Sequence, residues 1–227
     1  MERKTACRGH AALIAVSALF ASAAAQAHPH MWIDARAVVE VDAGHRLTAV
    51  RQEWRFDDMF GAYATQGLKR GKRGELPPEV LEGMARDWMR SLGEPVSHYF
   101  TRVTVRGEAQ AFAEPRDARV RWDPRTQRLT LAFTLPVARP AAPGPDGAQV
   151  DIYDPTYFVA YAFDAPDAVS VDGPGAAACK AGYRKPKELD WKTMQQLAAI
   201  PADPDALPEE LFAITKGLTH RIGLRCS

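Results

Sequence analysis

The sequence predicts a mainly β protein of the α+β class: an antiparallel β-sandwich-like body, a helical insertion at about 57–95 and a helical C-terminal region. Two observations predict this class. Apolar and polar residues alternate over 31–41 and 47–56, which is typical of half-buried strands. Over 77–92 the apolar residues instead recur every fourth position, which is typical of a helix. Strand signals on both sides of a helical segment favour a β body that carries an insertion.

The first two predicted strands form a hairpin. The odd-numbered residues of 31–41 are apolar, and Asp42-Ala43-Gly44-His45 follows as a turn. The second strand runs from Leu47 to Phe56 and ends in Asp57-Asp58, which is predicted to cap a short helix.

A longer helix is predicted to begin at Pro77-Pro78-Glu79 and to end at Gly93-Glu94-Pro95. Its apolar residues lie on one face at helical spacing and include Met84 and Trp88. We interpret these aromatic and methionine side chains as core rather than as a ligand-binding group.

Alternation returns at 102–106, at 119–122 and at 129–135, and the last two segments form a second hairpin around a turn at 123–126. Residues 136–147 contain four prolines and two glycines, so they are predicted to form a loop.

The rest of the chain is mixed. The stretch 149–163 is apolar on both faces after Asp154-Pro155, which predicts a central strand there that is covered on both sides, and 169–171 predicts a short edge strand. Helical spacing is seen at 187–199 and at 207–218, and 220–226 is predicted as a closing strand.

Residues 1–27 have the pattern of a secretory signal peptide. Three basic residues precede a small, apolar run over 11–25, and Ala25-Gln26-Ala27 is typical of a signal-peptidase site. The run is shorter than the roughly 20 apolar residues of a membrane span, although an uncleaved anchor is the alternative. We therefore expect an exported protein whose mature form, 28–227, is a single domain that does not insert into the membrane.

Cleavage would leave 200 residues with 26 basic and 27 acidic side chains, a net charge of −1. This balance gives no electrostatic footprint for nucleic acid or for an anionic membrane. Cys179 and Cys226 would remain, and an even pair in an oxidising compartment predicts a disulfide. A metal site made of the two cysteines, with His220 near in sequence, is the alternative.

The mature chain would begin His28-Pro29-His30. A terminal histidine can chelate a transition metal through its α-amine and its imidazole together, and His30 adds a second imidazole on the same side of an extended segment. Pro29 has no N–H, so the square-planar mode that uses deprotonated backbone amides is blocked. The sequence thus predicts a brace-like site for Cu, Zn or Ni. The alternative is that both histidines only form local hydrogen bonds.

Further ligands are less sharply indicated. Asp57 and Asp154 lie at strand ends and are candidate metal ligands, but carboxylates there also serve as turn or cap residues. His45, His98 and His220 are isolated and are interpreted as surface or hydrogen-bonded residues.

Residues 69–80 do not have the pattern of a calcium-binding loop. With Gly74 at the sixth position of an EF-hand loop, the ligand positions hold no acidic residue. Calcium binding is therefore not expected there.

Four segments together resemble a bacterial domain-of-unknown-function family. They are His28-Pro29-His30-Met31-Trp32-Ile33-Asp34, Glu53-Trp54-Arg55-Phe56-Asp57, Tyr99-Phe100 and Tyr153-Asp154-Pro155-Thr156-Tyr157-Phe158. Members of that family are described as the periplasmic component of an uncharacterised ABC-type transport system and are associated with nickel/cobalt or zinc transport.

The resemblance implies a periplasmic accessory protein that binds a transition metal ion (Zn, Ni/Co or Cu) and serves an inner-membrane metal transporter or permease. It does not establish a substrate. A metal-free interaction module of a transporter complex and a copper-brace oxidoreductase are the alternatives. No catalytic residues are predicted, because no Ser-His-Asp, phosphate-loop or paired-carboxylate pattern is seen.

Overall fold

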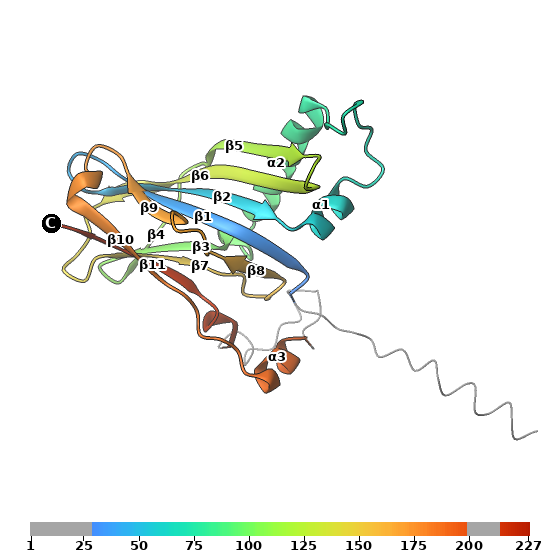
Figure 1. Cartoon of the computed structure of the whole chain (residues 1–227). Helices are drawn as coiled ribbons and strands as arrows, with labels where there is room; N and C mark the ends of the chain where they lie inside the picture. Colours follow the sequence, from blue (N-terminus) through green and yellow to red (C-terminus); the bar gives the residue numbers. More distant parts are fainter. Residues whose placement is uncertain (1–28, 199–213) are drawn as a thin grey trace, which may run out of the picture.

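A computed structural model describes residues 29–198 and 214–227. Two β-sheets lie face to face, and the helices gather toward one end of the body (Figure 1). The predicted mainly β, α+β fold class is confirmed. Within the described residues, no helix is long and apolar enough to cross a membrane.

The first sheet has six strands in the order β5-β6-β2-β1-β8, and β9 also pairs with β1. Its strands are β1 (Met31–Val41), β2 (Leu47–Phe56), β5 (Arg116–Asp123), β6 (Arg128–Ala141), β8 (Val159–Ala162) and β9 (Val169–Asp172).

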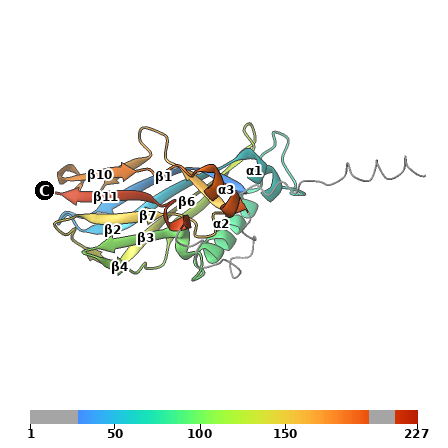
Figure 2. The ribbon, with the colours of Figure 1, turned by 90° about the horizontal axis from the view of Figure 1, so that it is seen from below.

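The second sheet has five strands in the order β10-β11-β7-β3-β4, and Figure 2 shows them side by side. They are β3 (Thr101–Val105), β4 (Glu108–Gln110), β7 (Ala148–Ile152), β10 (Cys179–Arg184) and β11 (His220–Cys226).

The first hairpin is confirmed. β1 and β2 pair antiparallel, and the odd-numbered residues of β1 from Ile33 to Val41 are buried, as the alternation predicts. The Asp42 carboxylate closes the turn by accepting hydrogen bonds from the backbone N–H groups of Gly44 and Arg46. On the outer face of the sheet, Asp34 is paired with Arg55 and Arg128, so this face carries ion pairs in place of apolar residues.

The core lies between the two sheets. Trp54 of β2 is at its centre, with its ring edge-on to Phe133 of β6 at a centroid distance of 4.9 Å. A buried hydrogen bond from Gln52 Nε2 to Thr101 Oγ1 (2.9 Å) joins β2 to β3 across the sheets. The other large, fully buried side chains of this core are Ile33, Leu47, Leu129, Leu131, Leu135, Ile152, Ile222 and Leu224.

A strand does follow Asp154-Pro155, as predicted, but its predicted central position is wrong, because this strand, β8, lies at the edge of the first sheet, where it pairs with β1. The residues before Asp154 form β7 in the second sheet. Asp154-Pro155 lies between them, where hydrogen bonds to the Asp154 carboxylate turn the chain from one sheet to the other. β8 and β9 both pair with β1 in parallel, so the first sheet is mixed and β8 is an edge strand.

The predicted loop over 136–147 is also shorter than expected, because β6 continues to Ala141. Pro136 has no N–H to donate, but its carbonyl still accepts a hydrogen bond from Ala113 N. Ala138 N donates to Ala111 O, so the strand remains paired beyond this proline. β4 and β10 were not predicted from the sequence.

The helical insertion is confirmed by α1 (Asp58–Ala64) and α2 (Pro78–Leu92), which are followed by a 3-10 turn, η2 (His98–Phe100). Asp57 caps α1, as predicted, and α2 packs against β5.

Near the C-terminus are a 3-10 turn, η3 (Ala176–Ala178), and α3 (Trp191–Ala198). Residues 214–216 are helical, and the rest of the helix predicted over 207–218 lies outside the described residues.

The predicted disulfide joins Cys179, at the start of β10, to Cys226, at the end of β11, with an S–S distance of 2.00 Å. The same two residues face each other in the antiparallel register of these strands. The alternative of a two-cysteine metal site is thereby replaced by a cross-strand link between the two strands at one side of the second sheet.

Candidate functional site

The start of β1 is fixed to the segment that leads into β8. Pro29 is buried, and the backbone N–H of His30 donates to Phe158 O at 3.0 Å. The imidazole of His30 is exposed and lies beside the Phe158 ring, with a centroid distance of 5.0 Å. The predicted signal peptide, residues 1–27, and His28 lie outside the described residues.

Asp57 connects the start of β1 to α1. Its Oδ2 accepts a hydrogen bond from Trp32 N at 2.8 Å, and its Oδ1 accepts one from Phe60 N at 2.7 Å. Both carboxylate oxygens therefore serve the backbone. Its role as a metal ligand stays a prediction.

Asp154 is buried in the turn between β7 and β8. Its Oδ1 accepts from the N–H and the hydroxyl of Thr156 at 2.8 and 2.7 Å, and its Oδ2 accepts from Val159 N at 2.9 Å. Burial raises the pKa of Asp154, and these hydrogen bonds offset only part of that effect. The carboxyl thus has an evident structural role, while its predicted role as a metal ligand stays a prediction.

The described residues include no cluster of three or more His, Cys, Asp or Glu side chains that is arranged to hold a metal. His28 and the free α-amine, which carry most of the predicted brace, are outside that part of the chain. His45 lies in the turn at the opposite end of β1 from His30, and His98 contacts Phe112.

His220 is buried at the start of β11. Its Nδ1 is 2.8 Å from the hydroxyl of Tyr183, which stacks on the imidazole at a centroid distance of 6.1 Å. Burial lowers the pKa of His220 to about 4; nearby Lys185 acts in the same direction and Asp164 in the opposite one. The imidazole is therefore neutral at pH 7 and accepts at Nδ1 when the hydroxyl donates.

This burial predicts acid-sensitive stability. His220 binds a proton below about pH 6.5 in the unfolded chain but only below about pH 4 in the folded protein. The free energy of unfolding should therefore fall by up to about 3 kcal/mol between these pH values. Urea unfolding of the protein and of His220→Gln at several pH values measures this effect. The variant should lose less stability on acidification, and identical pH slopes would contradict the assignment.

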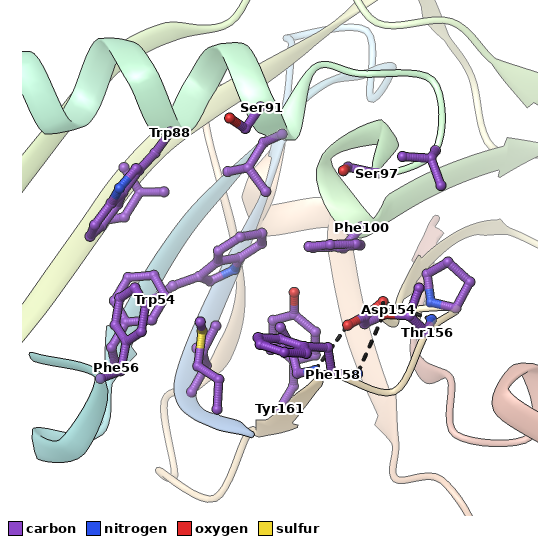
Figure 3. A pocket seen from close by; sticks show the side chains of 18 residues that line it. Trp54, Phe56, Trp88, Ser91, Ser97, Phe100, Asp154, Thr156, Phe158 and Tyr161 are labelled. Carbon is purple, nitrogen blue, oxygen red and sulfur yellow. Dashed lines mark hydrogen bonds between the residues drawn. The ribbon is translucent and has the colours of Figure 1, made fainter. Parts of the chain in front are cut away.

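An apolar cavity of about 380 Å³ opens beside the N-terminal strand (Figure 3). Seven aromatic rings from the first sheet, from the helical insertion and from the segments just before β3 and β8 contribute to its wall. They belong to Trp54, Phe56, Phe60, Trp88, Phe100, Phe158 and Tyr161.

The polar groups of the cavity lie mainly on one side, where Asp154 and Thr156 line the wall near Tyr161 (Figure 3). The hydroxyl of Tyr161 points into the cavity, is buried, and has no hydrogen-bond partner among the described residues. Burial raises the pKa of Tyr161 well above 10.0, and the negative charge of Asp154 adds to this. A buried hydroxyl without a partner costs about 1–3 kcal/mol, so its position demands an explanation.

Trp54 is held rigidly in this wall. Its Nε1 donates to Gln52 Oε1 at 3.1 Å, and Gln52 in turn donates to Thr101. The indole is also edge-on to Tyr161, with a centroid distance of 5.4 Å. Two neighbouring elements thus fix the ring, and the cavity wall is preformed.

Sequence reasoning assigned the aromatic residues of the insertion to the core and so missed the cavity. Trp88 and Phe60 do pack on Phe56, as a core assignment requires. The concentration of aromatic residues in the segments that resemble the family, such as Tyr99-Phe100, was the available signal.

Comparison with known proteins identifies the family of this chain. Residues 13–226 match the family model described as "Protein of unknown function (DUF1007)". The chain belongs to the DUF1007 family. One relative, an "Uncharacterized protein" of Haemophilus influenzae, is 24% identical over 152 residues, which cover 66% of this chain and 70% of the relative. No solved structure matches this DUF1007 protein.

Proposed function

We propose that this protein is a periplasmic accessory factor that binds a transition metal ion through a mature N-terminus beginning at His28. The ion is its cargo, exchanged with an inner-membrane metal transporter or permease. The proposal includes cleavage of residues 1–27, which frees the α-amine of His28.

The observation that carries the proposal is the way the start of β1 is held. The backbone N–H of His30 donates to Phe158 O, which fixes the residue at the start of β1, and His30 itself lies at the surface. Anchoring one ligand on a strand reduces the conformational entropy that metal binding must overcome.

The donor set that fits is the α-amine and ring of His28 together with the ring of His30. Three nitrogen donors suit Cu(II), Zn and Ni, and they leave positions for a ligand from a transporter. Asp57 and Asp154 fit less well, because every one of their carboxylate oxygens already accepts a hydrogen bond from the protein. The proposed site therefore rests on the two histidines.

The test is a metal titration of two forms of the exported protein, one that begins at His28 and one with a single glycine before it. Mass spectrometry first checks that the natural form begins at His28. The natural form should bind one Cu, Zn or Ni ion per chain, and the extended form should bind at least about tenfold more weakly, because its α-amine is displaced.

Two variants sharpen the result. His30→Ala should weaken binding as the extension does. His45→Asn should not, because it removes an imidazole at the far end of β1, at a position whose φ of 59° asparagine accepts. Equal binding by the natural and extended forms would place any metal elsewhere. No binding by either form would favour the metal-free interaction module.

A further inference from the structure

We propose that the cavity beside β1 is a binding site for a small, neutral, mainly aromatic molecule that carries one hydrogen-bond acceptor, and that the hydroxyl of Tyr161 donates to this acceptor. This inference is independent of the metal proposal, because it uses the cavity rather than the N-terminal nitrogens.

The size and the wall of the cavity define the apolar part of the ligand. A dry apolar cavity of about 150 Å³ accommodates benzene, so about 380 Å³ has room for a bicyclic molecule. The ring faces and edges that Figure 3 shows around the cavity favour a planar aromatic ligand, because aromatic rings stack or meet edge to face.

The Tyr161 hydroxyl defines the polar part. It is buried in the wall, points into the cavity and has no partner in the described chain. Two polar groups near this hydroxyl are engaged elsewhere: Trp54 donates to Gln52, and both oxygens of Asp154 accept hydrogen bonds from other groups. A carbonyl or ether oxygen on the ligand would give the hydroxyl the acceptor that the described residues do not provide.

The charge of the ligand follows from Asp154, which lines the same side of the cavity as Thr156. Within 29–198 and 214–227, no basic side chain lines the wall. A carboxylate or phosphate on the ligand would lose its hydration without gaining a counter-ion, so a neutral acceptor is favoured over an anionic one.

Access is provided at the end of α2. Ser91 and Val96 line the cavity and are themselves exposed, so the cavity reaches the surface between α2 and η2. A ligand can therefore enter without unfolding of either sheet.

The experiment uses two probes of nearly equal shape, acetylnaphthalene and isopropenylnaphthalene, which differ only in having a carbonyl oxygen or a methylene group. Binding to the full protein is measured by calorimetry and by saturation-transfer NMR with a metal chelator present. Both probes should bind at one site, and the ketone should bind about five- to tenfold more tightly, as expected for one hydrogen bond.

Two variants assign this preference to the cavity. Tyr161→Phe should keep the affinity for the hydrocarbon and remove the preference for the ketone. Ser91→Trp, a change at an exposed position of the rim, should weaken both probes at least about tenfold by filling the entrance.

Failure of both probes to bind would overturn the proposal. So would a ketone preference that survives in Tyr161→Phe, or binding that is unaffected in Ser91→Trp. Because a chelator is present throughout, a negative result here leaves metal binding by the N-terminus unaffected, and loss of metal binding by the glycine-extended form leaves this result unaffected.

Discussion

Loss of the Cys179–Cys226 disulfide is expected to lower the free energy of unfolding by about 4 kcal/mol, since the two cysteines are 47 residues apart. A cross-link over a segment of this length removes much of the conformational freedom of the unfolded chain. For a protein of this size the change corresponds to a fall in Tm of roughly 8–16 °C.

Loss of the disulfide is expected to affect the whole second sheet because of where the disulfide lies. β11 lies between β10 and β7, and it is the last strand of the chain. Its buried residues Ile222 and Leu224 face the core, so fraying of this strand would expose the centre of the sandwich.

The measurement compares urea unfolding of the oxidised protein, the reduced protein and the double variant Cys179→Ala/Cys226→Ala. Reduced protein and double variant should unfold at similar, lower urea concentrations. Addition of a reductant to the double variant is the control and should change nothing. Equal unfolding midpoints for the oxidised protein and the double variant would show that the link contributes little.

Local patterns predicted the local structure well. Period-two alternation located β1 and β2 with their correct faces, because one face of each strand is buried in the sandwich. The capping role of Asp57 was also predicted, because a helix cap depends on residues close to it along the chain.

Long-range pairing was predicted less well. The apolar segments before and after Asp154 are close in sequence, yet β7 and β8 belong to different sheets. The turn between the two strands is held by three hydrogen bonds to the buried carboxylate of Asp154. The periodicity of apolar residues does not reveal such a turn.

The candidate site likewise has one part that the sequence predicted and one part that it did not. His30 could be found from sequence, because its interest comes from a neighbouring cleavage pattern and from residue spacing. Periodicity alone could not reveal the cavity, because a ring that lines a cavity and a ring that fills a core have the same periodicity. Trp88 lies on the predicted helical face in either case.

Gly61→Ala is expected to destabilise the protein by about 1–3 kcal/mol or more, although alanine is the better helix former by about 1 kcal/mol. A Cβ at this position in α1 would lie 1.9 Å from the backbone oxygen of Gln127, in the turn before β6. Backbone cannot move aside as a flexible side chain can, so α1 or the turn must shift.

Gly83→Ala is the matched control, since it makes the same change in α2. The nearest atom to its new Cβ would be Arg86 Nη2, at 3.9 Å. Here the intrinsic preference should dominate and stabilise the protein by about 0.5–1 kcal/mol. Unfolding in urea should thus shift in opposite directions for the two variants, and a shift in the same direction would contradict the close contact between α1 and the turn.

The displacement of α1 that is expected in Gly61→Ala also tests whether the aromatic wall of the cavity depends on this helix. Phe60 extends from this helix to Phe56, with a ring-centroid distance of 4.7 Å, and both line the cavity. Displacement of α1 in Gly61→Ala should therefore weaken binding of both naphthalene probes, while Gly83→Ala should leave it unchanged. Loss of stability with unaltered probe binding would show that the cavity keeps its shape without the support of α1.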